Sequence, residues 1–170
     1  NGVTFESGTK TIIEKFHAIT GIEERRYAED HLNASDLAFA ASKEAISAAN
    51  IDKNTLDYII VAHNFGEVSK GTIQSDMLPS LASRVKNKLG ILNANCVAYD
   101  LIFGCPGWVQ GIIQAESFIK SGLAKKVVVV GTETLSRVVD DKDRDSMIYA
   151  DGAGACVLES KDATSNNGIL

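Results

Sequence analysis

The chain has 170 residues, of which 45% are hydrophobic and 23% charged, so a packed core is expected and the composition argues against intrinsic disorder. Its formal net charge is −5 and no basic tract occurs, which argues against a surface for nucleic acid or an anionic membrane. Residues 1–6 lack the pattern of a secretory signal, and no apolar run is long enough for a membrane span. The length allows one domain, and the absence of an initial Met predicts part of a longer protein.

Helical and strand patterns alternate along the chain. In chain order, the sequence predicts helix 9–19, helix 35–49, strand 58–62, helix 79–89, strand 96–101, helix 106–121, strand 127–130 and strand 153–158. Strands that are apolar throughout and separated by helices indicate an α/β fold, a layered and mainly parallel sheet with helices on both faces. One layered domain is expected to extend to about Glu159.

The ends of the predicted helices carry recognisable signals. Ser35 is expected to be the N-cap of its helix, and Asn50 to take the left-handed position after that helix. Pro79 fits the first position of the next helix and Gly90 the position beyond its end. The same pattern predicts that Leu78 faces the core.

The three cysteines, Cys96, Cys105 and Cys156, are widely spaced and have no neighbouring His or second Cys. This spacing fits neither a zinc site nor a disulfide framework, and it predicts a reduced, cytoplasmic protein. Cys96 and Cys156 lie within apolar strands, where Cys acts as a small hydrophobic residue.

Cys105 has a different setting, in Gly104-Cys105-Pro106-Gly107 between a strand and a helix. If Pro106 is the first helical residue, Cys105 lies at or beside the N-cap, where helix amides and the positive helix end favour a nucleophilic thiolate. The alternative is a packed structural thiol. The following helix has a stripe of small residues and apolar residues on its other faces, so we expect it to be buried nearly all round, with Cys105 deep in the protein.

No convincing base accompanies this thiol. Of His17, His31 and His63, only His63 ends a strand near the functional edge of the sheet, and a hydrogen-bonded structural role is favoured for it. No metal site is expected, because Asp141, Asp143 and Asp145 imitate the opening of a calcium loop without its Gly and Glu. No dinucleotide site is expected, because Gly152-Ala153-Gly154 lacks the third Gly and the following helix of that fingerprint.

Several short segments, read in order, resemble one family. They are Gly21-Ile22-Glu23-Glu24-Arg25, Ser35-Asp36-Leu37-Ala38, Leu78-Pro79-Ser80, Tyr99-Asp100 with Gly104-Cys105-Pro106-Gly107-Trp108, Val130-Gly131-Thr132-Glu133, Leu135-Ser136-Arg137, Asp143-Arg144 and Asp151-Gly152-Ala153-Gly154-Ala155. From about Thr20 to Glu159 the chain is similar to the N-terminal half of β-ketoacyl-acyl-carrier-protein synthase III, a thiolase-fold condensing enzyme.

The resemblance implies that Cys105 accepts an acyl group from a coenzyme A thioester and passes it to a carbanion made from malonyl-carrier protein, in fatty acid or related lipid biosynthesis. It also implies a homodimer, acyl carrier protein as partner, and no bound cofactor. The family's catalytic His and Asn lie in a second half. Residues 1–170 are therefore expected to form one N-terminal domain that lacks the family's opening strand and is inactive alone.

The resemblance also assigns substrate-binding positions. Arg144 matches a coenzyme A-contacting Arg, with a solvated loop residue as the alternative, whereas Lys15 and Ile19 replace a Trp and an Arg that grip the adenine. Met77 and Leu78 match a loop that closes the acyl pocket of the partner subunit, and their flexible side chains suit a medium or long acyl chain. A plain core role for Leu78 remains open.

Two other functions stay open beside the condensing enzyme. One is an ester- or amide-forming acyltransferase of the same fold, or a synthase that primes a specialised lipid. The other is a non-catalytic lobe that only dimerises or binds a partner.

Overall fold

The computed structural model describes residues 8–140 and 142–161, without the side chain of Arg144. Its elements, in chain order, are α1 (Thr9–Thr20), α2 (Ala34–Ala48), η1 (Lys53–Thr55), β1 (Tyr58–His63), β2 (Glu67–Val68), β3 (Ser75–Asp76), α3 (Leu81–Leu89), β4 (Val97–Ile102), α4 (Gly107–Lys120), β5 (Lys126–Thr134), η2 (Leu135–Arg137), η3 (Arg144–Ile148) and β6 (Asp151–Glu159). Each helix and strand expected from the sequence is present, with ends that differ by a few residues.

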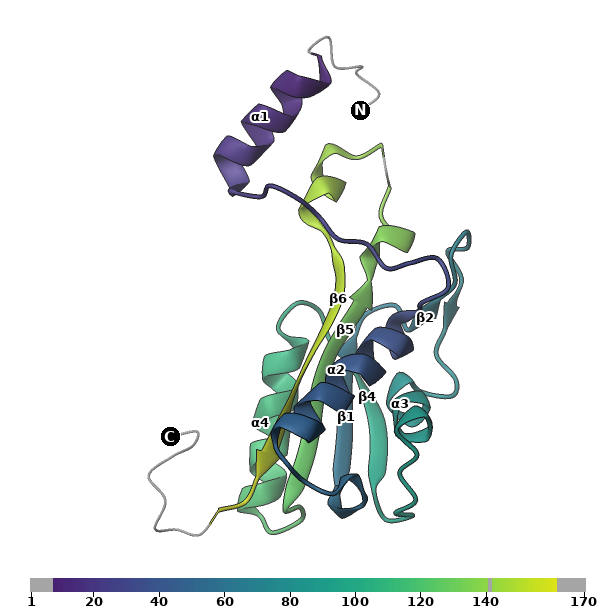
Figure 1. The fold of residues 1–170 in the computed structure, drawn as a ribbon, viewed down its shortest axis with the longest axis vertical. Coiled ribbons are helices and arrows are strands. Elements are labelled where there is room, and N and C mark those ends of the chain that lie inside the picture. Colours follow the sequence, from purple (N-terminus) through teal and green to yellow (C-terminus); the bar gives the residue numbers. More distant parts are fainter. Residues whose placement is uncertain (1–7, 141, 162–170) are drawn as a thin grey trace.

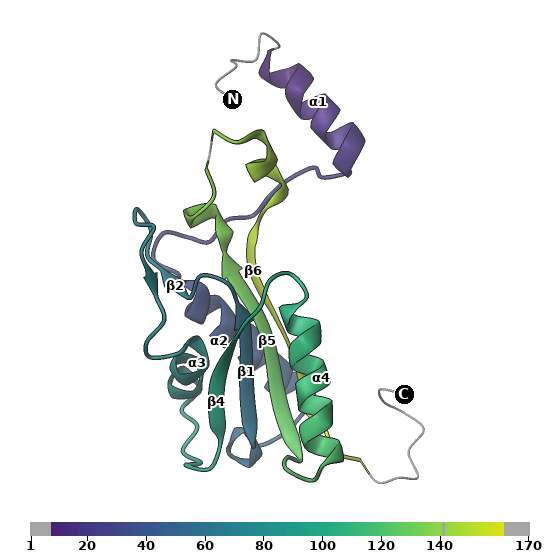
Figure 2. The same ribbon diagram turned by 180° about the vertical axis from the view of Figure 1, so that it is seen from behind.

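The main sheet has the strand order β4-β1-β5-β6 (Figure 1). Strand β1 pairs in parallel with both β4 and β5, and β6 runs antiparallel to β5. Helices α2 and α3 cover one face, and α4 covers the other, as the view from behind shows (Figure 2). The predicted α/β class, with a mainly parallel sheet and helices on both faces, is confirmed.

The two-sided cover explains the unbroken apolar strands. In β1, Ile59 and Val61 pack under α2 and α3, whereas Ile60 packs on the opposite side with Ala115 of α4. Successive strand side chains point to opposite faces, so a strand covered on both sides needs apolar residues at every position. The β-branched residues of β5 follow the same rule.

The start of α2 differs from the sequence expectation. Its N-cap is Asn33, whose backbone N–H donates to the Asp36 carboxylate at 2.9 Å. Ser35 is therefore not the cap: it is buried in the first turn, where its N–H and hydroxyl both donate to Glu67. At the other end, Asn50 has the predicted left-handed backbone, with φ of 52°.

Helix α3 starts later than expected. Its N-cap is Ser80, whose hydroxyl accepts the Ser83 N–H at 3.1 Å, and Pro79 lies outside the helix. Leu78 consequently does not continue the buried stripe of α3, and its side chain is 83% exposed, so the expected inward position was wrong. Gly90 ends the helix with φ of 63°, as predicted.

Helix α4 is not buried all round, contrary to the sequence expectation. Only Gly107, Gly111 and Ala115 are buried, and they form the side that lies against the sheet. Trp108 is 41% exposed, and Val109 and other apolar residues of that face are also uncovered. Within residues 8–140 and 142–161 no second layer packs on this side, which is why the apolar face of α4 stays open.

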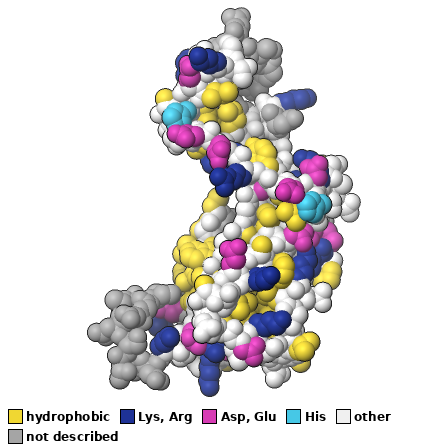
Figure 3. All heavy atoms as spheres, in the orientation of Figure 1, with side chains coloured by type: hydrophobic (Ala, Val, Ile, Leu, Met, Phe, Trp, Pro, Cys, Tyr) yellow, Lys and Arg dark blue, Asp and Glu magenta, His cyan; other side chains and the backbone are white. Residues whose placement is uncertain are grey.

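Helix α1 lies beyond one end of the sheet, away from the layered body (Figure 1). It has the predicted helical pattern, yet none of its residues is buried, and Ile19 is 84% exposed. Figure 3 shows apolar side chains uncovered at this end of the molecule. In the part of the chain that the structure describes, no helix is long and apolar enough to cross a membrane.

Candidate functional site

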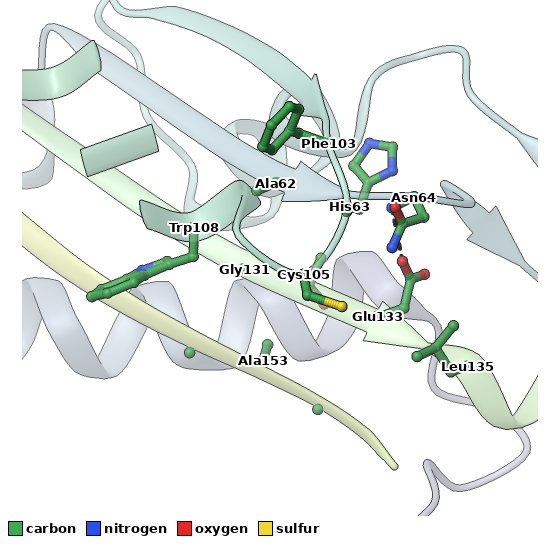
Figure 4. Close-up of a pocket in the computed structure, with 14 residues that line it drawn as sticks. Ala62, His63, Asn64, Phe103, Cys105, Trp108, Gly131, Glu133, Leu135 and Ala153 are labelled. Carbon is green, nitrogen blue, oxygen red and sulfur yellow. Dashed lines mark hydrogen bonds between the residues drawn. The ribbon is translucent and has the colours of Figure 1, made fainter. Parts of the chain in front are cut away.

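A pocket of about 310 Å³ opens at the carboxyl ends of β1 and β5, beside the start of α4 (Figure 4). It is lined by Ala62, His63, Asn64, Phe103, Gly104, Cys105, Trp108, Gly131, Thr132, Glu133, Leu135, Gly152, Ala153 and Gly154. The carboxyl ends of parallel strands are where α/β proteins place their ligands. The pocket therefore marks the functional edge of this sheet.

Cys105 lies in the loop that joins β4 to α4, and it lines the same pocket as Gly131 and Glu133 (Figure 4). The thiol is exposed, so the expectation of a deeply buried Cys105 was wrong for this chain. Pro106 is the N-cap and Gly107 the first helical residue, one position later than predicted. The thiol thus stands just before the helix, open to a reactant.

The expected contact of the thiol with the helix amides is not made among the described residues. The Gly107 N–H donates instead to the Gly104 carbonyl at 2.7 Å. Pro106 has no N–H to offer at the cap. The sulfur of Cys105 is therefore placed near the positive end of α4 without being tied to it.

Glycines bring α4 against the sheet and thereby position this loop. A Cβ on Gly107 would lie 3.1 Å from the Cβ of Ala62, and one on Gly131 would lie 3.3 Å from the Cβ of Trp108. Such distances are tighter than ordinary side-chain contacts. The first residue of α4 can therefore sit directly on the end of β1, with Cys105 above the strand ends.

Asn64 and Glu133 both line this pocket and lie next to each other (Figure 4). The Asn64 N–H donates to Glu133 Oε2 at 2.8 Å, which links the end of β1 to the end of β5. The sequence analysis gave neither residue a role in the site, although Glu133 lies in one of the segments that carry the resemblance. The available signal was their position at the ends of adjacent parallel strands, where polar side chains converge.

His63 is fully committed to hydrogen bonds. Its Nδ1 accepts the Gly66 N–H at 3.0 Å, so its Nε2 carries the proton and donates to Asp100 Oδ2 at 2.9 Å. The ring is buried, and neither nitrogen is free to take a proton from Cys105. The predicted structural role of His63 is confirmed.

The other two cysteines behave as the sequence predicts. Cys96 is 3% exposed and Cys156 is half-buried, and both are free thiols. Burial raises the pKa of the Cys96 thiol and, in the same way, the pKa of the Cys156 thiol. Both thiols are therefore held in the unreactive protonated form.

The expected substrate-binding residues lie apart from this pocket. Met77 is half-buried with its sulfur against Gly66, and the neighbouring Leu78 is exposed. Arg144 begins η3, and its side chain lies outside the described part of the chain. Within the residues described, no group of three His, Cys, Asp or Glu side chains could hold a metal ion.

Comparison with known proteins agrees with this arrangement. The family model of 3-oxoacyl-[acyl-carrier-protein] synthase III matches residues 99–170, which include Cys105 and β5. The chain is 41% identical over 166 residues to a β-ketoacyl-[acyl-carrier-protein] synthase III of Vibrio vulnificus, covering 97% of this chain and 48% of the relative. It is 39% identical over 169 residues to the β-ketoacyl-[acyl-carrier-protein] synthase III of Ehrlichia canis, covering 99% of this chain and 48% of the relative.

The chain is thus similar, over nearly its whole length, to β-ketoacyl-acyl-carrier-protein synthase III enzymes. It spans about half the length of the curated relatives it matches. The solved synthase III of Aquifex aeolicus superposes with a TM-score of 0.75 at 35% identity, over 87% of this chain and 45% of that structure. A priming β-ketosynthase of the R1128 polyketide pathway superposes with a TM-score of 0.77 at 31% identity, over 92% of this chain and 43% of that structure. The chain therefore has the fold expected from the resemblance.

Proposed function

We propose that this chain is the nucleophile-bearing half of a β-ketoacyl-acyl-carrier-protein synthase III, with Cys105 as the acyl acceptor. The observation that carries the proposal is an exposed thiol just before α4, in a pocket at the carboxyl ends of parallel strands. The similarity to synthase III enzymes on both sides of Cys105 supports the same role. A non-catalytic lobe would not need an accessible thiol in this place.

The reaction has two steps. The Cys105 thiolate attacks the carbonyl carbon of an acyl thioester, a new S–C bond forms, and the donor leaves as its thiolate. Malonyl-carrier protein then loses carbon dioxide, and the resulting carbanion attacks the acyl carbon and releases Cys105. The backbone N–H of Cys105 is proposed to stabilise the oxyanion of each tetrahedral intermediate.

The base that assists these steps is proposed to come from a second half of the protein. His63 is occupied by Gly66 and Asp100, so the described residues offer no free imidazole beside Cys105. The chain matches about half of each relative, and this agrees with a base supplied elsewhere. The 170-residue chain alone is therefore expected to be inactive in condensation.

The proposed substrates are acyl-coenzyme A or acyl-carrier-protein thioesters, and acyl carrier protein is the proposed protein partner. A cytoplasmic homodimer is proposed, and the exposed apolar face of α4 suits a protein in which further layers pack on this one. No bound cofactor is proposed, because thioester exchange needs only a nucleophile, a base and oxyanion donors. Arg144, Met77 and Leu78 are proposed to contact the substrate.

One structural neighbour supports a second function. The priming β-ketosynthase of a polyketide pathway superposes as well as the fatty acid enzymes do. In that case the chemistry at Cys105 is unchanged, and the product primes a specialised lipid or polyketide.

The deciding experiment is mass spectrometry of the Cys105 peptide after incubation of the full-length gene product with acyl-coenzyme A and acyl-carrier-protein donors. The expected result is an acyl adduct on Cys105 of the wild-type protein, which hydroxylamine at neutral pH removes to release the free thiol. The adduct should be absent from Cys105→Ser. No adduct with any thioester donor contradicts the synthase function.

A further inference from the structure

Apart from the thiol itself, one side chain gives the Cys105 pocket its charge. Of the described residues that line the pocket, only His63, Cys105 and Glu133 are titratable, and none is Lys or Arg. The His63 ring is neutral, because its Nδ1 accepts the Gly66 N–H and its Nε2 donates to Asp100. The Glu133 carboxylate therefore determines the sign of the charge in this pocket.

The Asp100 carboxylate behind His63 does not line the pocket. The amides of Leu81 and Ala82 each donate to it at 2.8 Å, at the positive end of α3. These bonds engage the Asp100 charge at α3. Glu133 is left as the carboxylate that an occupant of the pocket meets.

Strand alternation brings Glu133 to the side of the sheet on which Cys105 lies. Val129 packs in the cluster beneath α4, and successive strand side chains point to opposite faces, so Gly131 and Glu133 continue on the α4 side. A Cβ on Gly131 would lie 3.3 Å from the Trp108 Cβ, which places this side of β5 against the start of α4. Gly131, Glu133 and Cys105 accordingly line one pocket (Figure 4).

No cation neutralises Glu133 among the described side chains. The Asn64 N–H donates to its Oε2 at 2.8 Å, and this uncharged amide orients the carboxylate without cancelling its charge. None of the ion pairs that the described residues form includes Glu133. A ligand of the pocket therefore meets a net negative charge.

The pocket is small enough for this charge to act on any group that Cys105 binds. A space of about 310 Å³ is roughly 8 Å across, which does not exceed the Debye length at physiological ionic strength. Two charges inside it are therefore weakly screened, and the surrounding protein lowers the dielectric between them. A second negative charge in this pocket is disfavoured.

We infer that Glu133 is a specificity-determining residue that favours uncharged acyl groups over carboxylate-bearing acyl groups at Cys105. The inference rests on the proposed function and adds the class of acyl group that the thiol accepts. In acylation, the thiolate sulfur forms a bond to the acyl carbonyl carbon, and the carrier leaves as its thiolate. An acyl group that ends in a carboxylate brings a second negative charge into the pocket with Glu133, and this repulsion slows its transfer to the sulfur.

This selection separates the two substrates of the proposed reaction. The first acyl group is bonded to Cys105 and lies in the pocket, so an uncharged group is favoured there. The malonyl group carries a carboxylate but forms no bond to the thiol, so its carboxylate need not lie against Glu133. Repulsion by Glu133 thus keeps malonyl thioesters from acylating Cys105 in place of the first substrate.

Three variants of the full-length gene product separate charge from shape. Glu133→Gln removes the charge and keeps an oxygen that can accept the Asn64 N–H. Glu133→Asp keeps the charge on a shorter side chain. Glu44→Gln is the matched control, because it changes the net charge of the chain by the same amount at an exposed residue of α2 outside the Cys105 pocket.

The first measurement needs no acyl transfer. Iodoacetate and iodoacetamide are similar in size and alkylate the same sulfur, but only iodoacetate is negatively charged. The ratio of their rates at Cys105 cancels any change in the amount of thiolate. We expect Glu133→Gln to raise the iodoacetate-to-iodoacetamide ratio at least about threefold, whereas Glu133→Asp and Glu44→Gln stay within about 1.5-fold of wild type. In about 1 M sodium chloride the wild-type ratio should rise, since the Debye length falls to about 3 Å.

The second measurement uses two acyl donors with the same number of acyl carbons. Butyryl-coenzyme A ends in a methyl group and succinyl-coenzyme A ends in a carboxylate, and mass spectrometry of the Cys105 peptide gives both acylation rates. We expect the wild-type protein to prefer butyryl-coenzyme A. Glu133→Gln should raise the succinyl-to-butyryl ratio at least about threefold, and Glu44→Gln should leave it unchanged.

Four results would overturn the inference. One is an unchanged alkylation ratio in Glu133→Gln, and another is an equal change in Glu133→Asp, because shape rather than charge would then be responsible. A wild-type alkylation ratio that does not respond to salt is the third, and it needs no variant if Glu133→Gln does not fold. The fourth is a shifted alkylation ratio with an unchanged succinyl-to-butyryl ratio, which would leave Glu133 without a role in acyl selection.

Failure of the proposed function gives a separate result. If no thioester donor acylates Cys105 of the wild-type protein, the proposed function fails and the inference falls with it, whatever the alkylation ratio.

Discussion

Gly111 of α4 and Val129 of β5 meet so closely that a Cβ on Gly111 would lie 2.7 Å from the Val129 Cγ1 atom. Val129 is fully buried in the cluster between α4 and the sheet, so it has little room to move. This contact sets how near the helix lies to the strands. It thereby sets the height of the Cys105 loop above the strand ends.

Gly111→Ala should therefore destabilise the protein by about 1–3 kcal/mol, the usual cost of overpacking a close-packed core. The gain in helix propensity from Gly to Ala offsets about 1 kcal/mol of the clash at most. Urea unfolding followed by circular dichroism measures the change. Gly154→Ala is the control, because no described atom lies within 4 Å of a Cβ there. Equal stability of the two variants would contradict the packing argument.

The three cysteines should differ sharply toward alkylating agents. Cys105 is exposed, whereas Cys96 is buried and burial raises the pKa of its thiol. Because the thiolate is the reactive form, we expect iodoacetamide at pH 7.5 to label Cys105 first, with Cys96 and Cys156 reacting at least about tenfold more slowly. Peptide mass spectrometry over a time course gives the order. In urea the three rates should converge, and labelling of Cys96 ahead of Cys105 in the folded protein would disprove the assignment.

Leu78→Phe should change substrate choice without changing stability. Leu78 is 83% exposed, so replacing it disturbs no core contact, but a rigid aromatic ring shortens the space that the proposed acyl pocket offers. We expect the preferred donor of the full-length protein to shift toward shorter acyl chains, with an unchanged melting temperature. Leu92→Phe, at a residue that is 87% exposed beyond α3, is the control. An unchanged donor profile in Leu78→Phe would remove Leu78 from the substrate site.

Ionised Asp36 should stabilise the fold fully above about pH 4 and progressively less below it. Burial by itself raises the pKa of Asp36, but the hydrogen bonds from Lys88 and the Asn33 N–H, with the Lys88 charge, outweigh it and hold this pKa below 3.8. A lowered folded-state pKa means that the stabilisation is present above the unfolded value and is lost as the pH falls through the folded value.

Asp36→Asn should accordingly cost about 1 kcal/mol or less near neutral pH, because the pair with Lys88 is partly exposed. The difference from wild type should shrink to nothing as the pH falls below 3.8. Urea titrations at several pH values measure it. A difference that grows in acid would show that the sign of the pKa shift is reversed.

Most of the fold could be predicted because its signals are local. Residues 127–130 are Val throughout, and only a strand covered on both faces uses such a run, so β5 and its surroundings followed directly. Gly90 and Asn50 both have the left-handed backbone that their types permit after a helix. The helix starts were less certain, since Ser35 and Asn33 are both good caps and only the packing of Ser35 against Glu67 chose between them.

The candidate site was predictable only in part. Cys105 stands out because Gly, Pro and Gly surround it at a strand-to-helix junction. Its exposure was not predictable, since an apolar helix behind it suggested burial, whereas Trp108, Val109 and Ile113 of that helix are exposed in the part of the chain that the structure describes. Leu78 followed the helical spacing of the buried Leu81, yet the Ser80 cap ends that pattern before it.

The sequence by itself determined the α/β class, the candidate nucleophile and the similarity to synthase III, because these depend on residue types and on neighbours along the chain. Only the tertiary structure decided that His63 binds Asp100, 37 residues away, and that the Asn64 amide binds Glu133, 69 residues away. Those contacts depend on strand order and register. Strand order is set by the packing of the whole sheet, and no short stretch of residues encodes it.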